Sequence, residues 1–331
     1  MGCIDGFARR RANMRVEPRG AAAAAAHPGA AAVVGYFSPT HGYAVGSVPA
    51  FGTHSEQRER GDFLKDTSVN STSANDGGLT EAVQQPGAVE LLLIRHGESE
   101  GNVAATEARD AGVEIIEVPA RDADVDLSGT GRDQAKALGT ALGRIAEEFR
   151  PDAVVSSPYA RARQTAEIAV ETAGWPLQVR TDERLRDREL GILDRLTRLG
   201  VENRYPEESE RRDWLGKLYY RPPGGESWAD VALRLRSVLA ELNSTGMGQR
   251  VMLVCHDAVI MLFRYVLEGL SEKELLDLAA REAILNASVT KFVRPSGVGP
   301  WTLESFNVAD HLAEQGVAVT QHAGDTSVRP R

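Results

Sequence analysis

Short, nearly continuous apolar runs alternate with segments of helical periodicity from residue 89 onward, and this alternation constrains the fold most. The apolar runs are AVELLLI at 88–94, DAVVSS at 152–157, LQVR at 177–180 and RVMLVCH at 250–256. Strands are almost wholly apolar when helices cover both faces of a parallel sheet. The pattern therefore predicts an α/β protein, with each run forming a buried strand.

The segments between the runs have the start and stop signals of helices. Ser128 is a good N-cap for the segment that follows it, with apolar residues at three- and four-residue spacing. Pro158 and Gly174 bound a second segment, and 227–242 and 258–267 give two more. With further strands at 289–293 and 303–307, we expect a three-layer α/β/α sandwich around a mostly parallel sheet.

Residues 1–88 differ in composition from the rest of the chain. They are rich in Ala, Gly, Ser and polar residues and have no amphipathic periodicity. Such a segment cannot bury enough apolar surface to offset the entropy lost on folding. We therefore predict a disordered N-terminal extension at 1–88, a folded domain at 89–315 and a flexible C-terminal tail at 316–331.

The net charge of −9 argues against a general nucleic-acid or anionic-membrane binder, because both partners require a basic surface. Two cysteines are too few for a disulfide framework or a cysteine zinc site. No apolar run reaches the roughly 18 residues of a transmembrane helix. We expect a cytoplasmic protein with no nucleic-acid or membrane partner; whether it forms a homodimer stays open.

Polar residues follow three of the predicted strands at the point where each strand ends. Arg95 and His96 follow the first strand, Arg161 lies just beyond the second, and His256 and Asp257 follow a later one. The carboxyl ends of parallel strands meet at one edge of the sheet, where α/β proteins bind ligands. Guanidinium groups match phosphate oxygens, and an imidazole can attack phosphorus. This edge therefore suits a small phosphate dianion.

Taken singly, each signal also has a structural interpretation, since an Arg-His pair at a strand end is usually an internal hydrogen-bonded pair. Their occurrence on one edge favours the functional interpretation. Cys255 suggests a cysteine phosphatase, but such a loop needs an arginine six residues on, and position 261 is Met. We discard that alternative.

Four blocks of sequence resemble the histidine phosphatase superfamily, in its phosphoglycerate mutase-like branch 1. They are RHGESEGN at 95–102, SSPYARARQTA at 156–166, RLRDRELG at 184–191 and VMLVCHDAVI at 251–260. The similarity spans roughly residues 89 to 312, in order. It implies a phosphoglycerate mutase-like fold and a phosphatase that needs no cofactor or metal, because cations of the protein neutralise the phosphoryl group.

Carried over residue by residue, the resemblance implies that His96 is the nucleophile and forms a phosphohistidine. Arg95, Arg161 and His256 would bind the phosphoryl oxygens, with Asn102 near the same pocket. The motif's spacing selects Arg161 rather than its neighbour two residues on. An imidazole with an ordinary pKa of about 6.5 is largely neutral near pH 7, and flanking cations keep it so.

The general acid is less well marked. The family's block usually has Glu where this chain has Asp187, which is one methylene shorter. Asp257 is an alternative because it directly follows His256, and the acid-phosphatase branch places its acid after that histidine. Glu189, in the same loop as Asp187, is the third candidate.

The resemblance leaves three functions to weigh. The first is hydrolysis of a small phosphorylated metabolite through a phosphohistidine. The second is mutase-type phosphoryl transfer, although the region of Asp187 lacks the Glu-Arg-His-Tyr-Gly pattern of such enzymes. The third is a weakly active, phosphate-ester-binding regulatory protein. We expect the segment 192–221 to cover the pocket. Most of its arginines should be solvated or paired with nearby carboxylates, and one or two should extend the site toward an acidic or polyphosphorylated substrate.

Overall fold

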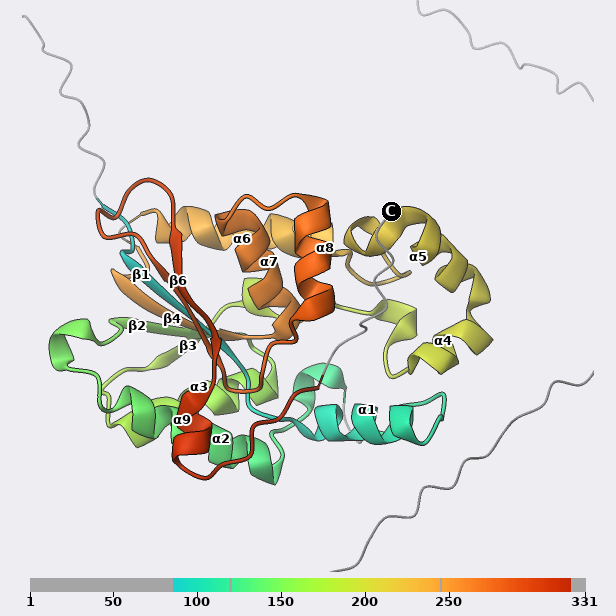
Figure 1. The fold of residues 1–331 in the computed structure, drawn as a ribbon, viewed down its shortest axis with the longest axis horizontal. Helices are drawn as coiled ribbons and strands as arrows, with labels where there is room; N and C mark the ends of the chain where they lie inside the picture. Colours follow the sequence, from blue (N-terminus) through green and yellow to red (C-terminus); the bar gives the residue numbers. More distant parts are fainter. Residues whose placement is uncertain (1–85, 119–120, 245, 323–331) are drawn as a thin grey trace, which may run out of the picture. The chain divides into compact units, whose positions relative to one another are not determined.

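The computed structural model describes residues 86–118, 121–244 and 246–322 (Figure 1). The chain divides into two units, 1–76 and 77–331, and all described residues belong to the second. The predicted N-terminal extension therefore lies outside the described residues up to position 85.

A six-stranded sheet in the order β3-β2-β4-β1-β5-β6 forms the centre of the second unit. The first four strands of that order are parallel, β5 pairs antiparallel with β1, and β6 pairs antiparallel with β5 at the edge of the sheet. The strands are β1 Glu90–Arg95, β2 Ala153–Ser156, β3 Val179–Thr181, β4 Arg250–Cys255, β5 Val289–Val293 and β6 Thr302–Val308. The predicted mostly parallel sheet is confirmed, and the parallel strands place their carboxyl ends at one edge.

Helices cover both faces of this sheet (Figure 1). Side chains alternate along β1, so Leu91 and Leu93 pack with α6 and α7 while Leu92 and Ile94 pack with α2 and α3. The helices are α1 Glu100–Asp110, α2 Gly129–Leu142, α3 Ala160–Ala173, α4 Arg198–Arg204, α5 Pro206–Tyr219, α6 Trp228–Leu242, α7 Asp257–Leu267, α8 Glu272–Arg281 and α9 Asp310–Glu314. None of the described helices is long and apolar enough to cross a membrane.

The helix boundaries follow the signals in the sequence. The Ser128 hydroxyl accepts a hydrogen bond from the Gly131 amide at the start of α2, and Ser227 forms a capping box at the start of α6. Gly174 ends α3 with a φ of +67°, a conformation that costs glycine nothing. Helix α1 was not predicted, because it buries only Ala108 and so lacks an apolar stripe.

Residues 316–322 continue to contact the domain beyond position 315, where the sequence predicts a flexible tail. The Gln134 side chain donates to the Ala318 carbonyl at 2.9 Å, and the main-chain amide of Asn286 donates to the main-chain carbonyl of Thr320 at 3.1 Å. These residues form a strap, 316–322, that runs from α9 to the carboxyl edge of the sheet. The remainder of the predicted tail, 323–331, lies outside the described residues.

Candidate active site

The predicted site residues Arg95 and His96 lie where β1 ends, and both are 3% exposed. The chain then turns at Gly97, whose amide donates to the Thr165 hydroxyl of α3 at 3.0 Å. A Cβ at Gly97 would lie 2.5 Å from the Gly131 carbonyl oxygen, so only glycine fits against the start of α2. This packing fixes the backbone that carries His96.

One ring nitrogen of His96 is hydrogen-bonded to the main chain, and the other is available to attack a substrate. Its Nδ1 lies 2.7 Å from the Gly97 carbonyl oxygen, which can only accept, so Nδ1 carries the proton and Nε2 the lone pair. Burial, followed by the nearby charge of Arg161 and by His256, holds the pKa of His96 well below its ordinary value. His96 is therefore a neutral imidazole at pH 7, as a nucleophile must be.

The Arg95 guanidinium is held by main-chain carbonyl groups. It donates to the Ile284 carbonyl and, at 3.3 Å, to the carbonyl of His322 in the strap. Its Nε is buried and has no hydrogen-bond partner among the described residues. Burial lowers the pKa of Arg95, against the opposing charges of Asp257 and Asp187. An N–H group of a cation is thus left for a ligand.

Arg161 lies in the first turn of α3 and is 4% exposed. Its guanidinium is bound by two carboxylates: Asp122 is contacted through both terminal nitrogens, and Asp187 Oδ2 lies 3.1 Å from Nη2. Burial disfavours the charge, but these carboxylates outweigh it and raise the pKa of Arg161. The two arginines of the site are therefore held in different ways.

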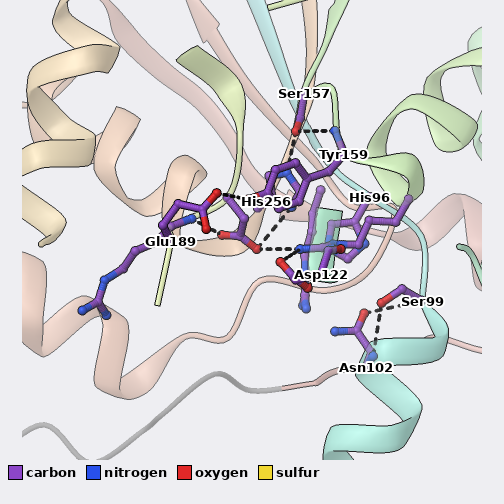
Figure 2. A network of polar contacts seen from close by, with 12 residues as sticks. His96, Ser99, Asn102, Asp122, Ser157, Tyr159, Glu189 and His256 are labelled. Atoms are coloured by element: carbon purple, nitrogen blue, oxygen red, sulfur yellow. Dashed lines mark hydrogen bonds and ion pairs between the residues drawn. The ribbon is translucent and has the colours of Figure 1, made fainter. Parts of the chain in front are cut away.

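His256 follows β4 and is fully buried. Its Nε2 lies 2.8 Å from the Ser157 hydroxyl, and its ring centroid is 5.2 Å from that of His96 (Figure 2). Its Nδ1 lies 3.3 Å from Asp187 Oδ2 but makes no hydrogen bond within the described structure. Burial, followed by Arg161, keeps the pKa of His256 well below its ordinary value.

The three candidate acids occupy different surroundings. Asp187 contacts Arg161 and also accepts from the Arg188 amide at 2.9 Å. Glu189 accepts from the Tyr159 hydroxyl at 2.7 Å (Figure 2). Asp257 opens α7, and burial, against the charge of Arg95, raises its pKa.

Asn102 reaches the nucleophile indirectly. Its side-chain oxygen accepts from the Ser99 amide at 3.2 Å in the capping box of α1 (Figure 2). The same oxygen accepts from Asn286 at 3.4 Å, and Asn286 also donates to the main-chain carbonyl of His96 at 3.1 Å. Asn102 and Asn286 thus tie α1 to the end of β1.

Several residues of this network were not found from the sequence. Tyr159 stands between Ser157 and Arg161 in the second block, so its motif could have marked it. Asp122 and His322 lie outside all four blocks, and no pattern around them indicates a site. His322 contacts Glu98 Oε2 at 2.9 Å from its Nε2, which connects the strap to the loop after His96.

Five arginines of the segment 192–221 are paired with carboxylates, as the sequence predicts for most of them; that one or two extend the site stays a prediction. The ion pairs are Arg195 with Glu117, Arg198 with Glu202, Arg204 with Glu114, Arg211 with Glu208 and Arg221 with Asp230. No group of three or more His, Cys, Asp or Glu side chains in the described parts of the chain is arranged to hold a metal ion.

Comparisons with known proteins match the blocks found in the sequence. The model of the histidine phosphatase superfamily, branch 1, matches residues 91–309. Phosphoglycerate mutase-like protein 4 of Arabidopsis thaliana is 30% identical over 243 residues, covering 71% of this chain and 92% of that protein. Glucosyl-3-phosphoglycerate phosphatase of Mycolicibacterium vanbaalenii is 32% identical over 187 residues, covering 54% of this chain and 74% of that protein.

A solved structure agrees with these sequence matches. That of a mycobacterial glucosyl-3-phosphoglycerate phosphatase superposes with a TM-score of 0.52 at 30% identity, covering 66% of this chain and 99% of that one. The family match spans the sheet and both helical layers, together with His96, Arg161 and His256. The chain belongs to branch 1 of the histidine phosphatase superfamily.

Proposed function

We propose that the protein hydrolyses a small phosphomonoester through a phosphohistidine at His96, without a metal ion. One observation carries the proposal: a buried, neutral imidazole has its Nδ1 proton bound to a carbonyl and lies at one edge with two buried guanidinium groups. The phosphatases among its relatives support hydrolysis as the reaction.

In the first step, the Nε2 lone pair of His96 attacks phosphorus while the bond to the ester oxygen breaks. Arg95 and Arg161 offset the charge on the non-bridging oxygens, with a hydrogen bond from His256. The leaving oxygen takes a proton from a carboxylic acid. In the second step, water attacks the phosphohistidine, the same carboxylate takes the water's proton, and His96 returns to its neutral form.

We assign the proton donor to Asp187, because it contacts two of the proposed phosphoryl ligands, Arg161 and His256. Asp257 is its rival, since its raised pKa is a property that a general acid needs. Asp187→Asn, Asp257→Asn and Glu189→Gln are compared on esters with poor and good leaving groups. Loss of the true acid harms turnover of the poor leaving group more, and an equal loss on both esters rules a residue out.

Mutase-type transfer is the second candidate, favoured by a 30% identical 2,3-bisphosphoglycerate-dependent phosphoglycerate mutase from Methylobacterium radiotolerans. A hydrolase releases free phosphate from a range of esters without a bisphosphoglycerate primer. A mutase requires the primer and returns the phosphoryl group to the substrate. Assaying both products on the same panel of esters separates the two reactions.

The deciding experiment for the proposal is a brief reaction with a labelled phosphate ester, followed by acid or base quenching. We expect a protein-bound phosphoryl group that is labile in acid and stable in base. His96→Ala should lose both label and turnover, whereas His311→Gln, which changes a buried histidine of α9, should keep both. Label and turnover that persist in His96→Ala overturn the proposal.

A further inference from the structure

The terminal nitrogens of Arg161 have no N–H group left for a substrate. Nη1 donates to the Asp122 carbonyl at 2.7 Å and to Asp122 Oδ1 at 3.1 Å. Nη2 donates to Asp122 Oδ2 and to Asp187 Oδ2, both at 3.1 Å. Each terminal nitrogen carries two hydrogens, so these four bonds use all of them. A phosphoryl group can bind the two terminal nitrogens only by replacing one of the present partners.

The two sides of this contact differ in their access to water. The side chain of Arg161 is 5% exposed, whereas those of Asp122 and Asp187 are 45% and 28% exposed. Moving the buried guanidinium would leave a charge without partners, which is costly. The half-exposed Asp122 carboxylate can instead turn into water, where it is well solvated. Asp122 is therefore the partner that leaves most easily.

The Asp122 carboxylate also has the shape of the group that would replace it. Its two oxygens accept in parallel from the two terminal nitrogens of Arg161, which is the geometry that a phosphoryl group adopts on a guanidinium. Arg95, in contrast, is held by neutral carbonyl groups and has a spare Nε–H. A carboxylate therefore competes with a phosphoryl group for Arg161, whereas neutral carbonyl groups are the partners of Arg95.

We propose that Asp122 is an exchangeable carboxylate that occupies the phosphoryl position on Arg161 when the site is empty. Substrate binding exchanges this carboxylate for the phosphoryl group, and its return helps to expel inorganic phosphate after the second step. Asp122 is then a residue that weakens phosphate binding and limits product inhibition. The inference builds on the proposed role of Arg161 as a phosphoryl ligand.

The test is the affinity for inorganic phosphate, measured by calorimetry so that turnover is not required. In Asp122→Asn and Asp122→Ala we expect phosphate to bind roughly 3- to 10-fold more tightly, because the ligand no longer displaces a charged partner. The KM for a phosphate ester should fall in parallel, and inorganic phosphate should inhibit at lower concentration.

Two control variants separate exchange from a general loss of negative charge. Asp124→Asn lies in the same short helix, 122–124, and removes a carboxylate that pairs with exposed Arg121. Asp194→Asn removes a carboxylate close enough to Asp122 for their charges to interact. Each should change phosphate affinity less than twofold. An Asp194→Asn effect as large as that of Asp122→Asn would overturn the exchange model.

Arg161→Ala completes the design. Once Arg161 is absent, adding Asp122→Asn should change phosphate affinity much less than it does in the presence of Arg161, because the exchange requires the guanidinium. If Asp122→Ala weakens phosphate binding and lowers kcat in the presence of Arg161, Asp122 is a positioning residue and the inference is wrong. If Arg161→Ala itself binds phosphate like the unaltered protein, the proposed function fails instead.

Discussion

The two buried arginines of the site are equally inaccessible but are held by different chemistry. Arg95 is 3% exposed and donates to main-chain carbonyl groups of Ile284 and His322. Arg161 is 4% exposed and donates to the side chains of Asp122 and Asp187. Arg95 is thus held by main-chain carbonyl groups, whereas Arg161 is held by two carboxylates as well as by the Asp122 main-chain carbonyl.

This difference reverses the direction of the two pKa shifts. Burial lowers the pKa of Arg95, because it outweighs the opposing charges of Asp257 and Asp187. Burial also opposes the charge of Arg161, but Asp122 and Asp187 outweigh it and raise the pKa. Arg95 therefore has no carboxylate hydrogen-bonded to it among the described residues, whereas the carboxylates bound to Arg161 compensate its charge until a ligand replaces one of them.

The largest expected effect comes from replacing each arginine by lysine. Arg95→Lys should lower kcat/KM by roughly 100-fold or more, because the single ammonium nitrogen cannot reproduce the spread of the three guanidinium nitrogens that reach the two carbonyls and a ligand. Arg161→Lys should lower it only about 10-fold, since an ammonium beside two carboxylates remains paired. Steady-state kinetics on one ester measures both. An equal loss of kcat/KM in both variants would mean that catalysis does not depend on whether an arginine is held by carbonyl groups or by carboxylates.

Deleting the strap tests the backbone support of Arg95. Removal of residues 316–331 takes away the His322 carbonyl and the contacts of Thr320 with Asn286. We expect kcat/KM to fall roughly 10-fold, because Arg95 loses the His322 carbonyl and Asn286, which donates to the His96 carbonyl, loses its contacts with Thr320. Removal of 324–331 deletes none of these contacts and is the matched control. Full activity without the strap would show that Arg95 is held adequately by Ile284.

Acid should destabilise the protein before it protonates the nucleophile. Burial gives His96 and His256 pKa values well below 6.5 in the folded state, so the unfolded chain binds more protons as the pH falls below 6.5. The free energy of unfolding should then decrease by about 1.4 kcal/mol per pH unit for each histidine. Denaturant titrations across this range measure the slope, and the His96→Gln variant should reduce it.

The same shift predicts that kcat/KM does not fall through protonation of His96 as the pH drops through 6.5. An NMR titration of the ring protons assigns the midpoint to the residue. A midpoint near 6.5 for His96 would contradict the effect of burial and of the neighbouring Arg161.

The smallest effect is expected for Thr320→Val, which removes one pair of bonds from the strap. The Thr320 hydroxyl donates to Asn286 Oδ1 at 3.1 Å and accepts from Gln134 at 2.8 Å. Its loss should cost about 1 kcal/mol of unfolding free energy and less than threefold in kcat/KM. If Thr320→Val lowered kcat/KM as much as the strap deletion does, the hydrogen bonds of this hydroxyl would account for most of the strap's effect on activity.

Most of the fold could be predicted because its signals are local. The apolar runs became β1, β2, β3 and β4, and the caps at Ser128, Gly174 and Ser227 bound the helices as expected. Helix α1 was missed because it packs few of its side chains. The strap was missed because it has no regular element, only hydrogen bonds to residues far away in the sequence.

The sequence by itself determined the family, the layered fold and the four residues grouped at or just after the strand ends, Arg95, His96, Arg161 and His256. These depend on short motifs and on periodicity, which a linear chain displays directly. Only the tertiary structure decided what each cation binds. The partners of Arg95 lie 189 and 227 residues away, and Asp122 lies 39 residues from Arg161. Contacts over such separations leave no local pattern, because folding alone brings the groups together.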